Sequence, residues 1–179
     1  MCINAAHLLR DGDVVFVGVG LPNLACNLAR RTHAPNLQLI YEAGVIGARP
    51  ARLPLSIGDP TLVSGAASVC NMFDIFSMYL QRGNVDVGFL GGAQIDQFGN
   101  INATVIGDYS HPKIRLPGSG GSQEIAGWAN RCYIMTPHQK RRFPEKVDFG
   151  TSAGFLGGRA EREATGARGG GPTVIVTNL

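Results

Sequence analysis

A chain of 179 residues with 44% hydrophobic residues, 16% charged residues and a formal net charge of +3 is expected to form one domain with a sizeable core rather than two domains. The mild charge comes without a dense Lys/Arg run interleaved with aromatic residues, which gives no support for nucleic-acid binding but suits a small anionic ligand. The four cysteines lie far apart, and neither a membrane-spanning stretch nor a signal peptide is evident, so the composition favours a cytoplasmic protein with reduced thiols and without a zinc site or disulfide framework.

Apolar runs and helical stripes alternate in a β-α-β order along the first part of the chain. A helix is predicted to end before residue 11, and a strand within 13–23 runs into a Gly/Pro turn. Helical spacing resumes over 24–31, and a second strand follows over 37–44. This strand is apolar enough to be buried on both faces, as the strands of parallel sheets are. The order predicts an α/β fold with an open, mostly parallel sheet and flanking helices.

The second part of the chain continues this pattern after an irregular stretch at residues 50–70. We expect a helix over 71–81, a third strand over 85–96 with a double glycine, a turn and a strand within 97–107, a short strand, a glycine loop and a helix within 113–129, and strands at 131–138 and 173–178. The polar, glycine-rich stretch 157–172 predicts a flexible segment. Because a strand stands at the very end, we expect residues 1–179 to be a single domain that is incomplete at its C-terminus.

An acid follows the second predicted strand in the string LIYEAGVIGARP, residues 39–50. Glu42 stands at the C-terminal end of a predicted parallel strand, where α/β folds place their ligand crevices, and Gly44 lets the backbone turn away behind it. A water-exposed turn residue would explain the same position. The G-V-G at residues 18–20 also resembles part of a dinucleotide fingerprint, but Asn23 occupies the position of its third glycine, which argues against a nucleotide cofactor.

Two glycine-rich loops are candidates for holding an anion. The loop PGSGGSQEIA, residues 117–126, presents several backbone amides directly before a predicted helix, and GGAQID, residues 91–96, repeats the idea with a glutamine side chain. An ordinary flexible turn is the alternative interpretation of either loop. The candidate residues are Gly118, Gly120, Gly121, Gly91, Gly92 and Gln94.

Basic residues in the second part of the chain could contact the phosphates of a ligand at the C-terminal edge of the sheet. The candidates are Lys113, Arg115, Lys140 and Arg141, with Arg142 beside them. A solvated basic face would account for the same residues.

Four segments together resemble the β subunits of class I (family I) CoA-transferases, and within that family the branch of the glutaconate CoA-transferase B subunit. They are VGVGLPNLACNLARR, YEAGVIGARP, FLGGAQIDQFGNINATVIGDYSHPKIRLPGSGG and HQKRRFPEKVDFGTSAGFLGG. The resemblance extends over most of residues 5–178 and includes a long string that is far more specific than a lone glycine motif. It implies the CoA-transferase-like α/β fold of the NagB/RpiA type.

The resemblance also implies a covalent mechanism in which Glu42 is the nucleophile. The carboxylate would attack an acyl-CoA thioester to give a mixed anhydride and then a glutamyl-CoA thioester, from which CoA passes to a free carboxylic acid, including a dicarboxylic one. The amides of Gly120 and Gly121 would stabilise the oxyanions, with Gly118 shaping the loop. The CoA thioester is then a substrate, and no tightly bound cofactor or metal is expected. Ala43 stands where the commoner signature has Asn, which leaves the acceptor acid open.

A separate α subunit is implied as the partner, in a hetero-oligomer of αβ pairs that dimerise further. Two alternatives remain at the level of the sequence. One is an acyl-CoA hydrolase, including ring-opening hydrolases, on the same fold. The other is a non-catalytic domain that senses a phosphorylated metabolite through the GSGG loop.

Overall fold

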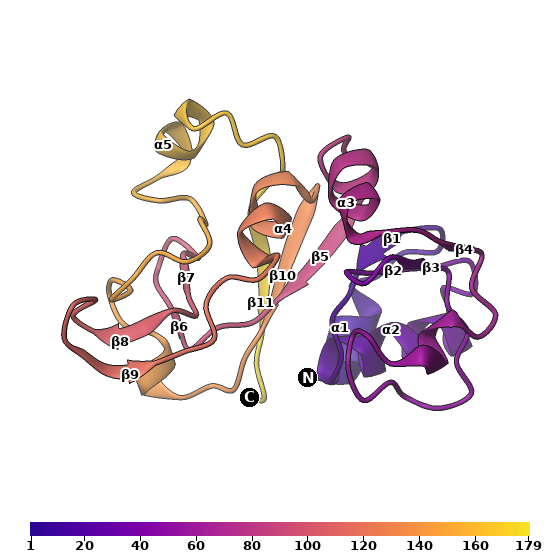
Figure 1. Ribbon diagram of the computed structural model, residues 1–179. Coiled ribbons are helices and arrows are strands. Elements are labelled where there is room, and N and C mark those ends of the chain that lie inside the picture. The colour runs from indigo at the N-terminus through magenta and orange to yellow at the C-terminus, as the bar shows by residue number, and fades with distance from the viewer.

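A central sheet of seven strands organises the computed structural model, which describes residues 1–179 (Figure 1). Its strands are β1 (Val14–Phe16), β2 (Gln38–Tyr41), β3 (Val45–Ile46), β4 (Ser68–Val69), β5 (Val87–Leu90), β10 (Arg131–Met135) and β11 (Pro172–Val176). The order across the sheet is β11-β10-β5-β1-β2-β3-β4. The first five strands in this order are parallel, and β3 and β4 add an antiparallel edge. The predicted α/β class with a mostly parallel sheet is confirmed.

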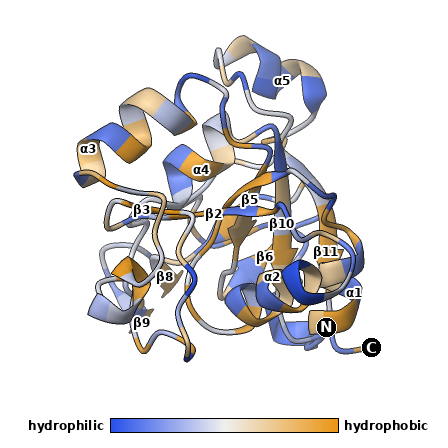
Figure 2. Ribbon diagram, turned by 90° about the vertical axis from the view of Figure 1, so that its right-hand side faces the viewer, coloured by the Kyte–Doolittle hydropathy of each residue, from blue (hydrophilic) through white to orange (hydrophobic).

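Helices cover both faces of the sheet. Successive strand residues point to opposite sides, so the sheet has an apolar face on each side that the helices bury. Val15 belongs to the core beneath α1 (Cys2–His7) and α2 (Leu21–Thr32), whereas Phe16 belongs to the core beneath α4 (Ser122–Trp128). The central strands are accordingly hydrophobic in Figure 2. Gly88 in β5 lets α4 approach closely, since a Cβ at this position would collide with Ile125.

Shorter elements complete the chain. Two small hairpins lie to one side of the sheet in Figure 1, formed by β6 (Gln94–Ile95) with β7 (Ile101–Asn102) and by β8 (Val105–Gly107) with β9 (Pro112–Arg115). The other helical segments are η1 (Pro60–Val63), α3 (Met72–Asp74), η2 (Ile75–Leu80), η3 (Lys140–Arg142) and α5 (Arg159–Ala164). No helix of the structure is both long enough and apolar enough to cross a membrane.

Most predicted elements are present, but two predicted strands end early at glycines. The strand expected over 37–44 stops at Tyr41, because Gly44 adopts φ +103° and the chain turns back into β3. The run expected as one strand over 85–96 is divided into β5 and β6. A side chain at Gly92, between them, would collide with Ile101, so the chain folds tightly here against β7.

The helix predicted over 71–81 is present in an unusual form. The short turn α3 is α-helical and continues as the π-helix η2, which still buries Ile75 and Leu80. The apolar stripe predicted which face is buried. It did not predict the wider π-helical turn, because an α-helix and a π-helix bury a similar stripe. Single π-helical turns are rare and often lie near functional sites.

The segment 157–172, expected to be flexible, contains the helix α5 and a buried arginine. Arg162 is 4% exposed, and its guanidinium donates hydrogen bonds to the carbonyls of Ala153, Gly154, Ala126 and Gly169. The backbone amide of Gly169 donates to Gly127 in α4 at 2.9 Å. These contacts tie the segment to α4, and a polar composition alone did not reveal them because they depend on residues distant in sequence.

Replacing Arg162 by methionine should lower the free energy of unfolding by about 3 kcal/mol or more, because four buried carbonyls lose their donor. Arg159→Met in the same helix is the matched control. The Arg159 side chain is 83% exposed and forms one ion pair at 3.6 Å, so its change should stay within about 0.5 kcal/mol. Urea unfolding of both variants measures the difference, and equal effects would contradict a structural role for Arg162.

Candidate active site

The carboxyl ends of β5, β1 and β2 meet at one edge of the sheet. From β1 the chain proceeds through α2 on one face to β2, and it later returns through η2 on the other face to β5. Ligand crevices of α/β folds form where the chain reverses direction in this way. A cavity of about 230 Å³ lies here, lined by Phe16, Val17, Gly18, Glu42, Ile57, Phe89, Leu90, Gly91, Ser119, Gly120, Gly121, Ser122 and Ile125.

Glu42 stands in the turn that joins β2 to β3. The amide of Gly44 donates to the Tyr41 carbonyl at 3.0 Å, and the Gly44 carbonyl accepts from the Cys70 amide at 2.8 Å. A Cβ at Gly44 would collide with the Cys70 carbonyl, so only glycine fits the turn. The half-buried Glu42 side chain lines the cavity, and none of the chain's four ion pairs involves it. Its carboxylate is therefore not neutralised by a cation of this chain.

A hydrogen bond between α2 and β2 supports the residue before Glu42. Tyr41 is fully buried, and its hydroxyl accepts a hydrogen bond of 2.5 Å from Asn23 in the first turn of α2. The Asn23 side chain in turn accepts from Asn27 at 2.8 Å. Burial raises the pKa of Tyr41 to about 12, against the opposing effect of the Asn23 bond. The sequence shows Asn23 only as a departure from a glycine fingerprint, because its partner Tyr41 is distant in the chain.

The glycine loop before α4 lines the cavity together with Glu42. Gly118 and Gly120 adopt φ of +95° and +48°, and the Gly118 amide donates to Ala103 at 2.8 Å. A Cβ placed on Gly121 would lie 2.5 Å from the Phe76 ring and 3.2 Å from Oε1 of Glu42. The loop and the carboxylate are thus in close proximity. The amides of Gly120 and Gly121 make none of the backbone hydrogen bonds outside the helices and strands, and they remain available to a ligand.

Only some of the predicted site residues gather at this cavity. Glu42, Gly120, Gly121 and Gly91 line it, whereas Gly118 and Gly92 lie in the same loops outside the lining. Gln94 does not face the cavity. Its buried side chain connects β7 to Asp148. The amide oxygen accepts a hydrogen bond from the Asn102 side chain at 2.7 Å, and the amide nitrogen donates one to the Asp148 carboxylate at 3.0 Å.

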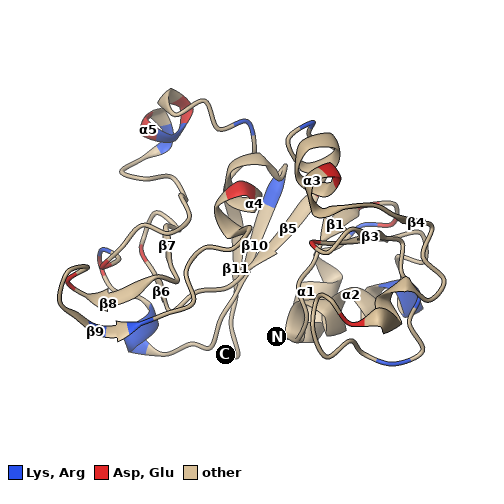
Figure 3. Ribbon diagram, in the orientation of Figure 1, with Lys and Arg blue, Asp and Glu red and all other residues tan.

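The predicted phosphate-contacting residues lie apart from the cavity on exposed elements. Lys113 and Arg115 are on β9, where the Arg115 guanidinium lies 4.6 Å from the centre of the Tyr109 ring. Lys140 and Arg141 are on η3. Lys and Arg residues, blue in Figure 3, are spread over several elements, including β10 and α5, rather than concentrated at the strand ends.

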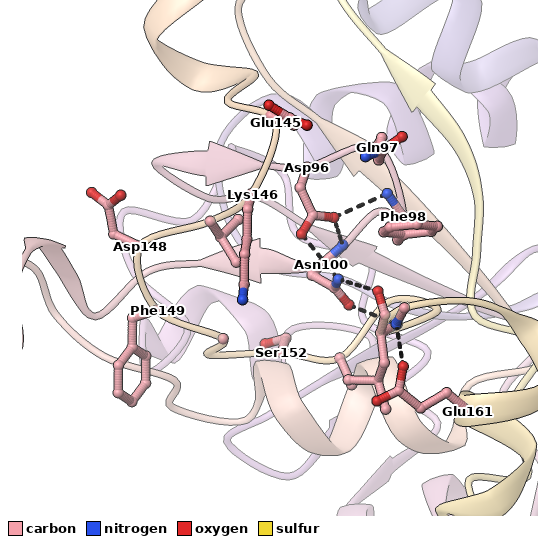
Figure 4. Close-up of a pocket in the computed structure, with 15 residues that line it drawn as sticks. Asp96, Gln97, Phe98, Asn100, Glu145, Lys146, Asp148, Phe149, Ser152 and Glu161 are labelled. Carbon is pink, nitrogen blue, oxygen red and sulfur yellow. Dashed lines mark hydrogen bonds between the residues drawn. The ribbon is translucent and has the colours of Figure 1, made fainter.

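A larger cavity of about 870 Å³ lies elsewhere, between the β6–β7 region and residues 145–161 (Figure 4). Several of its polar side chains, among them Asp96 and Asn100, are used in hydrogen bonds within the chain. The Asp96 carboxylate accepts from the amides of Phe98 and Asn100, and the Asn100 side chain bonds Gly154 and Leu156. We assign the candidate active site to the smaller cavity, because there the Glu42 carboxylate lies close to the unbonded backbone amides of Gly120 and Gly121 at the ends of the parallel strands.

The matching family model and two close relatives of this chain are all named as CoA-transferases. A family model described as Coenzyme A transferase matches residues 1–175. The chain is 52% identical over 179 residues to the B subunit of 3-oxoadipate CoA-transferase of Pseudomonas knackmussii, a match that covers 100% of this chain and 69% of that protein. It is 41% identical over 182 residues to the B subunit of glutaconate CoA-transferase of Acidaminococcus fermentans, a match that covers 98% of this chain and 68% of that protein.

Two solved structures extend the comparison. The crystal structure of glutaconate coenzyme A-transferase from Acidaminococcus fermentans matches with a TM-score of 0.92 and 39% identity, over 98% of this chain and 69% of that one. The crystal structure of the decarboxylase AibA/AibB matches with a TM-score of 0.79 and 30% identity, over 87% of this chain and 65% of that one. Similar architectures therefore carry more than one chemistry, and the residues of the cavity must decide which applies.

Tyr41→Phe should reduce the loss of stability at alkaline pH. A tyrosine whose pKa is raised from 10 to about 12 in the folded chain contributes stability that is complete below pH 10 and lost as the pH rises to 12. The loss amounts to about 2 to 3 kcal/mol at most. Tyr41→Phe lacks this pH-dependent part of the unfolding free energy. It also lacks the hydrogen bond to Asn23, which contributes about 1 kcal/mol at neutral pH.

Urea unfolding at pH 8 and pH 11 checks this expectation. The decrease in unfolding free energy between the two pH values should be smaller in Tyr41→Phe than in the wild-type chain. Tyr109→Phe, at an exposed tyrosine, is the control and should behave as the wild type does. An equal decrease in all three proteins would contradict the assignment to Tyr41.

Proposed function

The chain belongs to the coenzyme A transferase family as a β-type subunit, and on this basis we propose that it moves CoA between an acyl-CoA and a free carboxylic acid through a covalent intermediate on Glu42. The resemblance to β subunits of class I CoA-transferases, including the glutaconate branch, is confirmed by these relatives. Family membership also sets aside the alternative of a non-catalytic sensor.

The observation that carries the proposal is that the Glu42 carboxylate lies close to the loop of Gly120 and Gly121 in one cavity. In the proposed reaction, a carboxylate oxygen of Glu42 attacks the thioester carbonyl, and the resulting oxyanion accepts hydrogen bonds from the two glycine amides. Collapse of this intermediate breaks the C–S bond and leaves a mixed anhydride and the CoA thiolate.

The CoA thiolate then attacks the glutamyl carbonyl, which releases the donor acid and leaves a glutamyl-CoA thioester. The acceptor carboxylate repeats both steps in reverse, so that Glu42 is regenerated and a new acyl-CoA departs. The same amides serve each oxyanion, and one preorganised donor of this kind typically contributes about 3 to 4 kcal/mol. Coenzyme A is a substrate in this scheme, and no tightly bound cofactor is needed.

We assign contacts with the CoA phosphates to the exposed basic residues of η3. The neighbouring Arg142 donates to the Gly92 carbonyl at 2.9 Å, which holds η3 beside the double-glycine loop that borders the cavity. Lys140 and Arg141 are then available to an anionic group approaching the cavity. Lys113 and Arg115 are alternative contacts that would require a longer reach along the surface.

Relatives suggest the acid and the partner. The names of the 52% and 41% identical relatives specify 3-oxoadipate and glutaconate, and both are short dicarboxylic acids. We therefore propose a short dicarboxylic acid as one of the exchanged acids. Each relative is by name the B subunit of its enzyme, which supports a partner α subunit that completes the active site.

Trapping of the covalent intermediate tests the proposal. The chain, purified with its α subunit, is incubated with acetyl-CoA or succinyl-CoA, reduced with borohydride and analysed by peptide mass spectrometry. A reduced adduct is expected on Glu42. Glu42→Gln should lower kcat by roughly 10³-fold or more, as removal of a covalent nucleophile does.

Glu124→Gln is the matched control, because Glu124 lies in the first turn of α4 outside the cavity and should tolerate the change. Normal turnover of Glu42→Gln would overturn the mechanism. Steady CoA release without any acceptor acid, with Glu42 unmodified, would favour the hydrolase alternative.

A pair of glycine variants, one before α4 and one within it, tests the position of the loop. Gly121→Ala places a methyl group between the Phe76 ring and the Glu42 carboxylate and should lower kcat by roughly 10²-fold, since small misplacements of reacting groups have effects of this size. Gly127→Ala meets no atom within 4 Å and should keep normal kcat while stabilising α4 by about 0.5 to 1 kcal/mol. Steady-state kinetics and urea unfolding measure both effects, and normal kcat in Gly121→Ala would separate the loop from the reaction.

A further inference from the structure

One lining residue of the Glu42 cavity, Ile57, comes from a surface loop rather than from the core. Residues 52–59 are closed by what we call the Arg52/Asp59 latch, in which the Asp59 carboxylate accepts two hydrogen bonds from the Arg52 guanidinium, at 2.8 and 3.0 Å. The same carboxylate accepts from the amides of Leu55 and Thr61, both at 2.9 Å. The Arg52 bonds and these amides hold the pKa of Asp59 well below its usual range, so the latch stays charged at neutral pH.

The latched loop directs two apolar side chains to different places. Leu55 is 86% exposed and does not line the cavity. Ile57, two residues further on, is half-buried and lines the cavity together with Glu42. The loop thus adds one apolar side chain to the surroundings of the carboxylate and leaves the other in solvent.

The remaining apolar residues around Glu42 have structural duties. Phe16, Val17, Phe89, Leu90 and Ile125 are buried members of the two cores, where substitutions would disturb the whole sheet. Ile57 belongs to neither core. Among the large apolar residues that line the cavity, Ile57 alone is outside both cores, so a substitution there changes the cavity without disturbing the sheet.

A glutamyl anhydride or thioester is activated toward water as well as toward the intended acid. Water attack at the glutamyl carbonyl of the thioester would break its C–S bond, release CoA with the proton from water, and leave one water oxygen in the Glu42 carboxylate. Transfer requires that the acceptor carboxylate reacts before water does. An apolar wall close to the carbonyl lowers the local water concentration and so favours transfer.

We propose that Ile57, positioned by the Arg52/Asp59 latch, is a specificity-determining residue that excludes water from the acylated Glu42 and so sets the ratio of transfer to hydrolysis. This inference rests on the proposed function of Glu42. It extends that function by naming a surface-loop residue, outside the nucleophile and the glycine loop, that directs the outcome of the reaction.

The test compares Ile57→Ala with Leu55→Ala in the complex with the α subunit. Acetyl-CoA is the donor, with 3-oxoadipate or glutaconate as the acceptor, and CoA release is measured with and without the acceptor. The ratio of hydrolysis to transfer should rise at least tenfold in Ile57→Ala and stay at the wild-type value in Leu55→Ala. Arg52→Ala, which opens the latch, should raise the ratio in the same direction.

Isotope labelling supplies a second measurement that a purely structural role would not affect. In H₂¹⁸O without acceptor, the Glu42 peptide of Ile57→Ala should gain ¹⁸O faster than that of the wild type or of Leu55→Ala. An unchanged ratio with normal transfer, or a proportional fall of both reactions, would overturn the role of Ile57. Failure of the proposed function would be recognised separately, because the wild-type complex would then show neither transfer nor an adduct on Glu42.

Discussion

The candidate active site depends on the parallel pairing that places β1 between β5 and β2. Val15 is in register with Leu39 of β2 and with Val87 of β5, so the three strands end at the same edge of the sheet. The connections that leave and re-enter this region run over opposite faces, which opens a crevice at the edge. Glu42 and Gly91 reach the same cavity because they directly follow two of these strands.

Within this crevice, backbone geometry and apolar packing rather than ion pairs define the surroundings of Glu42. The turn at Gly44 admits no side chain, the loop at Gly121 fits against the Phe76 ring, and Asn23 holds the end of β2 through Tyr41. The Glu42 carboxylate takes part in none of the chain's salt bridges and lies beside the unbonded amides of the glycine loop. The arrangement therefore suits a nucleophile better than a residue that stabilises the fold.

The sequence was most informative where a pattern is local and long enough to recognise. The parallel strands are short continuous apolar runs, and their order predicted the α/β fold, which is confirmed. The two-residue strands β3 and β4 carry no such pattern, since their pairing depends on the turn at Gly44. The helix α5 was missed in a glycine-rich segment because buried hydrogen bonds of Arg162, not local composition, stabilise it.

The amino-acid order was enough to place an acid after a buried strand and glycine-rich loops after later strands, because strand ends and glycine clusters are local features. The resemblance implied that the loop of Gly120 and Gly121 lies beside that acid, but which other candidate residues do so became known only from the folded chain. Folding brought Gly121 to Glu42, kept Gln94 in a separate hydrogen-bond network, and added Ile57 from a stretch that looked irregular. Such contacts join residues far apart in the chain, and they arise from sheet order and helix packing, which no local periodicity encodes.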